Sequence, residues 1–108
     1  MSQDESGFRQ EVDRTLKALL QQIDELDPDR VDARLAAGSL TVQFEGGGTF
    51  VLSQQTPTRE LWLSANLRAW HFDKRDGAWR ERDSREDMLQ VLDRLFSGAL
   101  ATDVHFHV

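Results

Sequence analysis

The stretch Leu40-Thr-Val-Gln-Phe-Glu-Gly-Gly-Gly-Thr-Phe-Val-Leu-Ser-Gln54 has the pattern of two strands joined by a tight turn. At positions 40–45 apolar and polar residues alternate, which is typical of a strand with one buried face. The three glycines at 46–48 can all adopt positive φ, so residues 49–54 are expected to return as the antiparallel partner. We therefore predict a hairpin near the middle of the chain.

Further strand patterns flank this hairpin. A weaker candidate precedes it at residues 31–36 and is separated from it by Gly38. Three short strands are predicted after it, at residues 60–64, 68–74 and 78–82. Because short turns connect neighbouring strands, the sheet should be antiparallel.

An amphipathic helix is predicted before the strands. Its apolar residues recur at steps of three and four along one stripe: Phe8, Val12, Leu16, Leu19, Ile23 and Leu26. Ser2 and Glu5 have the spacing of a capping box, although Asp4 and Ser6 could cap the helix instead. Pro28 is expected to end the helix, because proline disfavours helical backbone at the residue before it.

A second helix is expected from about Ser84, with Asp87 at the capping-box position and Gly98 just beyond its C-terminus. Its apolar face comprises Met88, Leu89, Val91, Leu92, Leu95 and Phe96. The tail, residues 103–108, alternates like a strand again. This order predicts one α+β domain over residues 1–108: a two-layer sandwich with two helices packed on one face of an antiparallel sheet of five to six strands.

The composition limits the classes of protein to which this chain can belong. Its 13 lysines and arginines against 19 aspartates and glutamates give a net charge of −6, which argues against binding to nucleic acid or an anionic membrane. No apolar run approaches the roughly 18 residues of a membrane span. The absence of cysteine excludes disulfides and thiolate chemistry. The acidic N-terminus resembles neither a signal peptide nor a transit peptide, so we expect a bacterial cytoplasmic protein.

Negative charge is concentrated near the N-terminus. Residues 1–32 contain nine acids and four bases, a net −5, which leaves −1 for the other 76 residues. Five of the carboxylates lie within nine positions: Asp24, Glu25, Asp27, Asp29 and Asp32. A helix C-terminus disfavours negative charge, so stability alone does not explain acids there. Exposed carboxylates suit hard cations or a basic partner, and a solvated acidic face that provides only solubility is the alternative interpretation.

Trp62 is a second candidate functional residue. In Glu60-Leu-Trp-Leu-Ser64 the two leucines point to one face of a strand and Trp62 to the other. If the leucines face the helices, Trp62 lies exposed on the open face with Glu60 and Ser64, where a tryptophan suggests a protein contact. The alternative is the reverse register, in which Trp62 belongs to the core. Trp70 and Trp79 are predicted to be core residues.

The histidines and the familiar catalytic motifs give weaker signals. His105 and His107 lie two residues apart on the predicted last strand, where they could chelate a transition metal. Incidental histidines on a frayed terminus are the default interpretation. His71 is expected to be an exposed or hydrogen-bonded sheet residue. The chain has no nucleophile elbow, P-loop, dinucleotide-binding or zinc-protease motif, so no enzyme class is indicated.

Several motifs together resemble the frataxin family, from about Ser6 to the C-terminus. They are the acidic first helix, Leu40-Thr-Val-Gln-Phe-Glu-Gly46, Gln55-Thr-Pro57, Leu61-Trp-Leu-Ser64, Trp70-His-Phe-Asp73, Trp79 and the second helix. The most specific part is Gln55-Thr-Pro-Thr-Arg-Glu-Leu-Trp-Leu-Ser64, which is similar to the family's Gln-x-Pro-x-x-x-x-Trp-Leu signature. Bacterial members of the family are the closest in length and layout.

This resemblance implies an iron-binding protein of iron–sulfur cluster assembly, without a catalytic step of its own. It places weakly bound Fe²⁺ or Fe³⁺, which other divalent cations could replace, on Asp24, Glu25, Asp27, Asp29 and Asp32, with Asp13 as a further ligand. It places contacts with the cysteine desulfurase and the cluster scaffold at Gln54, Gln55 and Trp62. The chain departs from the family pattern at Glu60, where a glutamine is usual, and at residues 20–22, which are often acidic.

Two other hypotheses stay open at this point. One is an acidic protein-interaction module whose carboxylates never meet metal. The other is a weak ferroxidase, which would require the carboxylates to hold two irons. We expect a monomer, with a metal-dependent oligomer as the alternative.

Overall fold

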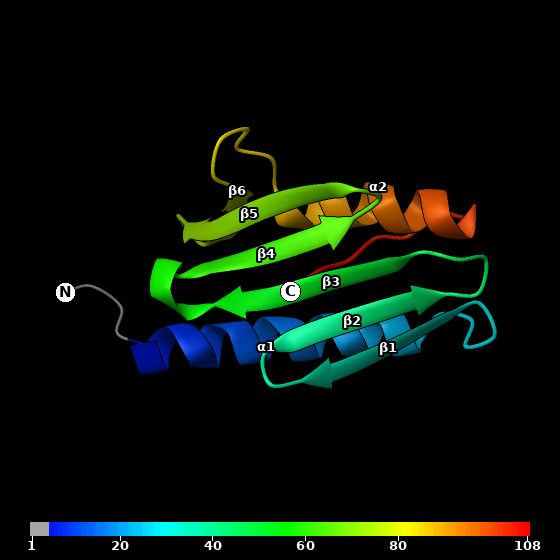
Figure 1. The fold of residues 1–108 in the computed structure, drawn as a ribbon, viewed down its shortest axis with the longest axis horizontal. Coiled ribbons are helices and arrows are strands. Elements are labelled where there is room, and N and C mark those ends of the chain that lie inside the picture. Colours follow the sequence, from blue (N-terminus) through cyan, green and yellow to red (C-terminus); the bar gives the residue numbers. More distant parts are fainter. Residues whose placement is uncertain (1–4) are drawn as a thin grey trace.

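Six antiparallel strands form one sheet in the order β1-β2-β3-β4-β5-β6, and two helices cover one of its faces (Figure 1). The computed structural model describes residues 5–108. The elements are α1 (Glu5–Asp24), β1 (Val31–Ala36), β2 (Ser39–Phe44), β3 (Thr49–Gln55), the 3₁₀ turn η1 (Thr56–Thr58), β4 (Glu60–Ala65), β5 (Arg68–Arg75), β6 (Ala78–Glu81) and α2 (Met88–Leu100). The predicted two-layer α+β architecture is confirmed.

The predicted turns connect the strands. Ala37 and Gly38 join β1 to β2, and Asp76 and Gly77 join β5 to β6, each with both residues at positive φ. Such two-residue turns match the twist of antiparallel neighbours. As a result every strand pairs with the next one along the chain, and the sheet is a simple meander.

Helix α1 buries the predicted stripe against the sheet, with Phe8, Val12, Leu16, Leu19 and Ile23 all buried. The predicted caps Ser2 and Asp4 lie outside the described residues. The helix ends at Asp24, before the position that Pro28 predicted. Its last turn tightens, because the amide N–H groups of Glu25 and Leu26 donate to carbonyls three residues earlier.

Helix α2 begins later than the sequence predicted. Asp87 is its N-cap and accepts the amide N–H of Leu89 (2.8 Å). The carboxylate of Glu81 accepts the amide N–H groups of Asp83 and Ser84 (2.7 and 2.8 Å), so these residues form a turn and not a first helical turn. The placement of Gly98 beyond the helix was also wrong, because α2 continues to Leu100.

The C-terminal tail is not a strand, although its alternation has a physical basis. Val104 and Phe106 are buried, and their amide N–H groups donate to Ser97 Oγ and Asp93 Oδ1 of α2, both at 2.8 Å. His107 and Gln22 of α1 exchange two hydrogen bonds, of 2.6 and 3.0 Å. The tail, red in Figure 1, is therefore tied to both helices, and the expectation of a frayed terminus was wrong.

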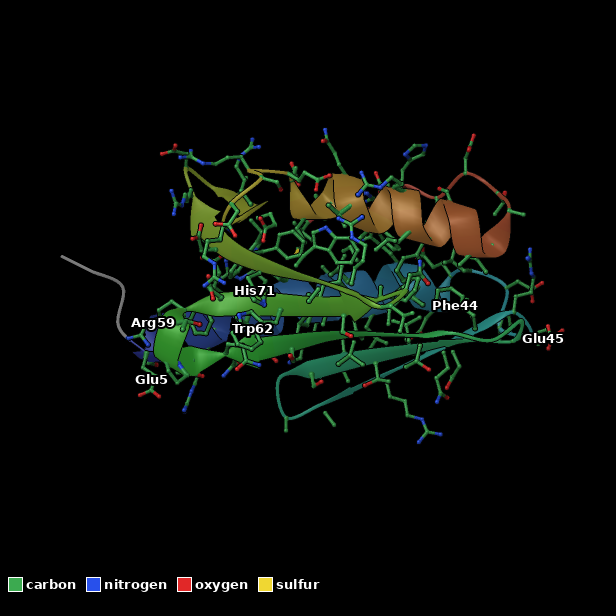
Figure 2. All side chains as sticks on the ribbon, turned by 45° about the horizontal axis from the view of Figure 1, so that its top comes forward. Glu5, Phe44, Glu45, Arg59, Trp62 and His71 are labelled. Atoms are coloured by element: carbon green, nitrogen blue, oxygen red, sulfur yellow. The ribbon has the colours of Figure 1, made fainter. Side chains whose placement is uncertain are left out.

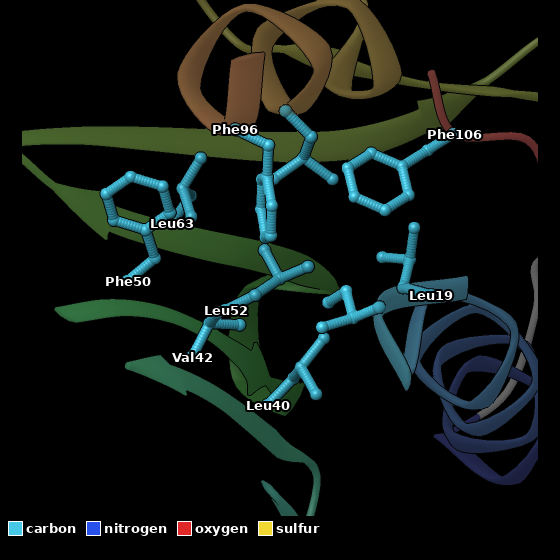
Figure 3. Close-up of a pocket in the computed structure, with 10 residues that line it drawn as sticks. Leu19, Leu40, Val42, Phe50, Leu52, Leu63, Phe96 and Phe106 are labelled. Atoms are coloured by element: carbon cyan, nitrogen blue, oxygen red, sulfur yellow. The ribbon is translucent and has the colours of Figure 1, made fainter. Parts of the chain in front are cut away.

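Aromatic rings fill the space between the layers, where Figure 3 shows Phe96 between Phe50 and Phe106. The ring of Phe96 contacts Phe50 and Phe106 edge-on, at centroid distances of 5.6 and 4.8 Å. The void at this place measures only about 10 Å³, so it holds no ligand. Trp70 and Trp79 are buried, as predicted.

Candidate functional site

Five carboxylates lie within nine consecutive positions from the end of α1 to β1, and we call them the acidic ridge: Asp24, Glu25, Asp27, Asp29 and Asp32. All five side chains are exposed. Asp24 is the last residue of α1, and Asp32 lies on β1, the edge strand of the sheet. The loop between them is held by Asp27, whose side chain accepts the amide N–H of Asp29 (2.9 Å).

The ridge has little compensating positive charge. Within residues 5–108 its one ion pair joins Asp32 to Arg34 (3.8 Å), and both of these side chains are exposed. The last turn of α1 carries no basic residue. Because the helix C-terminus adds partial negative charge, the local potential favours a bound cation or a basic partner.

Glu45 belongs to this surface and was missed by the sequence analysis. Its amide N–H donates to the carbonyl of Arg30 (2.9 Å), and it lines a shallow depression together with Asp29 and Asp32. Figure 2 shows Glu45 at the end of the sheet that is remote from Trp62. Its position follows from the pairing of β1 with β2, in which Val31 lies opposite Phe44.

Asp13 lies away from the ridge. It is eleven residues before Asp24 on the same helix, which is about 16 Å along the axis. Its carboxylate instead pairs with Lys17 (2.9 Å). Nowhere in the described part of the chain do three or more acidic or histidine side chains converge on a point where they could hold a metal ion. The ridge thus offers single oxygen ligands on an open surface, an arrangement suited to weak and exchangeable binding.

The register predicted for Trp62 is confirmed. Leu61 and Leu63 are 0% and 1% exposed, and Trp62 lies on the face of the sheet that the helices leave uncovered. The prediction that Trp62 is exposed was wrong in part, because its side chain is half-buried. Its cross-strand neighbour His71 stacks on it, with ring centroids 4.3 Å apart and the planes inclined by 28°.

Two charged groups complete the surroundings of Trp62. Glu60 is only 4% exposed, and its Oε1 accepts the indole N–H of Trp62 (2.9 Å). Arg82 Nη1 lies 3.6 Å from the other oxygen of Glu60, and Arg82 Nη2 lies 2.6 Å from Nδ1 of His71. A guanidinium has only donors, so Nδ1 of His71 accepts in this contact.

The two glutamines predicted to contact partners lie on opposite faces of the sheet. Gln55 pairs with Glu60 and so shares the face of Trp62. Gln54 pairs with the buried Leu61, which puts it on the other face. The structure therefore brings Gln55 and Trp62 to one surface and separates Gln54 from them.

Glu81 fixes the loop that carries Arg82. Burial raises the pKa of Glu81, but the amide N–H groups of Ser84, Asp83 and His71 that it accepts outweigh this and hold the pKa below its ordinary value. The ionised carboxylate is thus the form that the fold prefers.

The structure does not place the histidine pair on a strand. His105 and His107 are both exposed, but no strand holds them. His105 Nδ1 lies 3.5 Å from Asp93 Oδ2, whereas the hydrogen bonds of His107 involve its backbone.

The matches between this chain and known proteins extend over nearly its whole length. The frataxin-like domain family matches residues 1–102. A relative from Pseudomonas fluorescens (strain SBW25), named iron-sulfur cluster assembly protein CyaY, is 39% identical over 108 residues that cover 98% of this chain and 97% of the relative. A protein of the same name from Pseudomonas aeruginosa is 36% identical over 104 residues, covering 94% of this chain and 95% of the relative.

Solved structures show the same fold. A frataxin from Psychromonas ingrahamii has a TM-score of 0.88 at 25% identity, covering 97% of this chain and 99% of the other. A trimeric frataxin from Saccharomyces cerevisiae, described as complexed with ferrous iron, has a TM-score of 0.72 at 24% identity and covers 94% of this chain and 90% of the other. Among the described residues, neither helix is long and apolar enough to cross a membrane.

Proposed function

Because this chain belongs to the frataxin family, we propose that it takes part in iron–sulfur cluster assembly, by binding iron on the acidic ridge and docking onto the assembly machinery. The names of its bacterial relatives support the assembly role. The proposal assigns the protein no catalytic step of its own.

The observation that carries the iron-binding part is the exposure of five ridge carboxylates that share a single ion pair within the described structure. Carboxylate oxygens suit hard cations, and an open surface leaves coordination positions for water and for transfer to an acceptor. The ferrous iron described for the yeast frataxin of the same fold is consistent with this chemistry. We add Glu45 to the ligand set and leave Asp13 out, because Asp13 lies about three helical turns away.

We propose that the protein docks onto its partners through two separate surfaces. The ridge is complementary to a basic surface, which we assign to the cysteine desulfurase, since opposite potentials steer association. The open face around Trp62 and Gln55 is assigned to the cluster scaffold, because a partly exposed tryptophan can bury further apolar area only against a partner. Gln54 is left out of this docking face because it belongs to the opposite side of the sheet.

Calorimetric titration with Fe²⁺ under anaerobic conditions tests the ridge. Replacing Asp27, Asp29 and Asp32 by asparagine should lower Fe²⁺ affinity about tenfold or more, and Glu45→Gln should lower it by a smaller factor. The control replaces Asp76, Asp83 and Asp103 by asparagine, because these exposed acids carry the same total charge and lie outside the ridge. Equal losses in both triple variants would mean that net charge, and not the ridge, attracts the metal.

The second candidate function is an acidic interaction module without metal. It is favoured by the absence of any preformed group of three ligands in residues 5–108. If Fe²⁺ binds neither the wild type nor the control while the desulfurase still binds through the ridge, this second function replaces the first.

A further inference from the structure

Four side chains on the open face form a closed ring of contacts, which we call the Trp62 platform: Trp62, Glu60, Arg82 and His71. The indole N–H of Trp62 donates to Glu60 (2.9 Å), and the other Glu60 oxygen pairs with Arg82 (3.6 Å). Arg82 in turn donates to His71 (2.6 Å), which stacks back on the indole (4.3 Å between centroids). Figure 2 shows Trp62 and His71 side by side on neighbouring strands.

Glu60 makes the ring depend on a cation. Its side chain is only 5% exposed, and a buried carboxylate is costly unless a positive charge and hydrogen bonds compensate it. The indole N–H alone is a neutral donor. Without Arg82, the Glu60 carboxylate would have to turn toward water, and the indole N–H of Trp62 would lose its acceptor.

The backbone places Arg82 where it can reach both groups. Its amide N–H donates to the carbonyl of His71 (2.8 Å), which joins the loop after β6 to β5. The amide N–H of His71 donates to Glu81 (3.2 Å), so the same loop is held from its other side. The guanidinium therefore starts from a fixed point beside the imidazole.

We propose that Arg82 is a positioning residue for partner docking: it holds Glu60 and His71 so that the indole of Trp62 keeps one orientation on the open face. This inference rests on the proposed function, in which Trp62 contacts the cluster scaffold. An indole held before binding loses less conformational freedom when a partner covers it, so the platform favours affinity through preorganisation.

The test compares four proteins: wild type, Arg82→Ala, Glu60→Gln and the double variant. In Arg82→Ala, the indole N–H resonance of Trp62 should broaden or split and exchange with solvent about tenfold faster, and the Kd for purified scaffold protein should rise about tenfold. Glu60→Gln removes the buried charge and keeps an oxygen that accepts the indole N–H. In that background the loss of Arg82 should change both quantities by less than about threefold.

The control is Arg85→Ala, which removes the same charge from an exposed residue of the same loop. It should leave the indole resonance unchanged and alter the Kd by less than about twofold. An unchanged indole resonance in Arg82→Ala would overturn the inference. An equal loss of scaffold affinity with and without Glu60→Gln would also overturn it, because Arg82 would then contact the partner directly. If Trp62→Ala retains full scaffold affinity, the docking face of the proposed function is itself wrong. The comparison of the indole resonance between wild type and Arg82→Ala needs no partner, so it still tests whether Arg82 positions Trp62.

Discussion

The imidazole of His71 covers one face of the Trp62 indole, with ring centroids 4.3 Å apart, and so leaves the tryptophan half-buried on a sheet face that no helix covers. This contact comes directly from register, because Trp62 and His71 are paired residues on β4 and β5. The residue that we propose for docking is therefore also part of a local structure, and its removal should affect both stability and binding.

Trp62→Ala should lower the free energy of unfolding by about 1–2 kcal/mol, because it removes the stack and the hydrogen-bond donor of Glu60. Trp70→Ala, in the core, should cost about 3–5 kcal/mol. Urea unfolding measures both, and scaffold binding at a temperature where both variants are folded separates the two roles. A loss in Trp62→Ala as large as in Trp70→Ala would show that Trp62 is chiefly a core residue.

The low pKa of Glu81 predicts a component of stability that depends on pH. A carboxyl group whose pKa falls on folding stabilises the native state above its unfolded value, which is ordinarily 4.5, and this contribution disappears as the pH falls through the folded value. Wild type should therefore be more stable than Glu81→Gln at neutral pH, and the difference should shrink below about pH 4.5. Thermal unfolding from pH 7 to 3 measures it, and a difference that grows in acid would contradict the assignment.

The tail should contribute to stability through its buried residues. Phe106→Ala should cost about 3–5 kcal/mol, because its ring packs edge-on against Phe96 and closes the space between the helices. His105→Ala, one residue away and exposed, should change stability by less than about 0.5 kcal/mol. Equal effects in denaturant unfolding would show that the tail detaches in solution.

In the absence of metal, the negative charges of the acidic ridge should lower the free energy of unfolding. Asp24 ends α1, whose last turn has no basic residue, so Asp24→Asn should raise the free energy of unfolding by about 0.3–1 kcal/mol at low ionic strength. The gain should fade in about 0.5 M salt, where the charges are screened. Destabilisation by Asp24→Asn at low salt would mean that this carboxylate makes a favourable contact in the native state.

The elements with strict alternation could be predicted from the sequence. The hairpin at 40–54 and the strand with Leu61 and Leu63 follow from period-two patterns, because a one-residue shift would expose the whole apolar set. The start of α2 could not be predicted, because the side chain of Glu81 accepts the amide N–H groups of Asp83 and Ser84, which lie just before this helix. The tail has the pattern of a strand, yet the partners of Phe106 are helical side chains.

Only part of the candidate site could be predicted from the sequence, because some of its residues come together only through the fold. The ridge is contiguous in sequence, so its carboxylates were visible there. Glu45 is brought to it only by strand pairing, and the contacts of Arg82 with Glu60 and His71 join residues on three separate segments. Consecutive residues of a strand face opposite sides, which is why Gln54 and Gln55 could not both accompany Trp62.

Iron binding by the acidic ridge can be measured by residue-resolved NMR of nitrogen-15-labelled protein titrated anaerobically with Fe²⁺. We expect paramagnetic broadening to begin at the amides of residues 24–32 and Glu45. Replacing the five ridge carboxylates by their amides should abolish it. Broadening that persists in this variant, or that maps instead to His105 and His107, would show that the ridge is not the iron site.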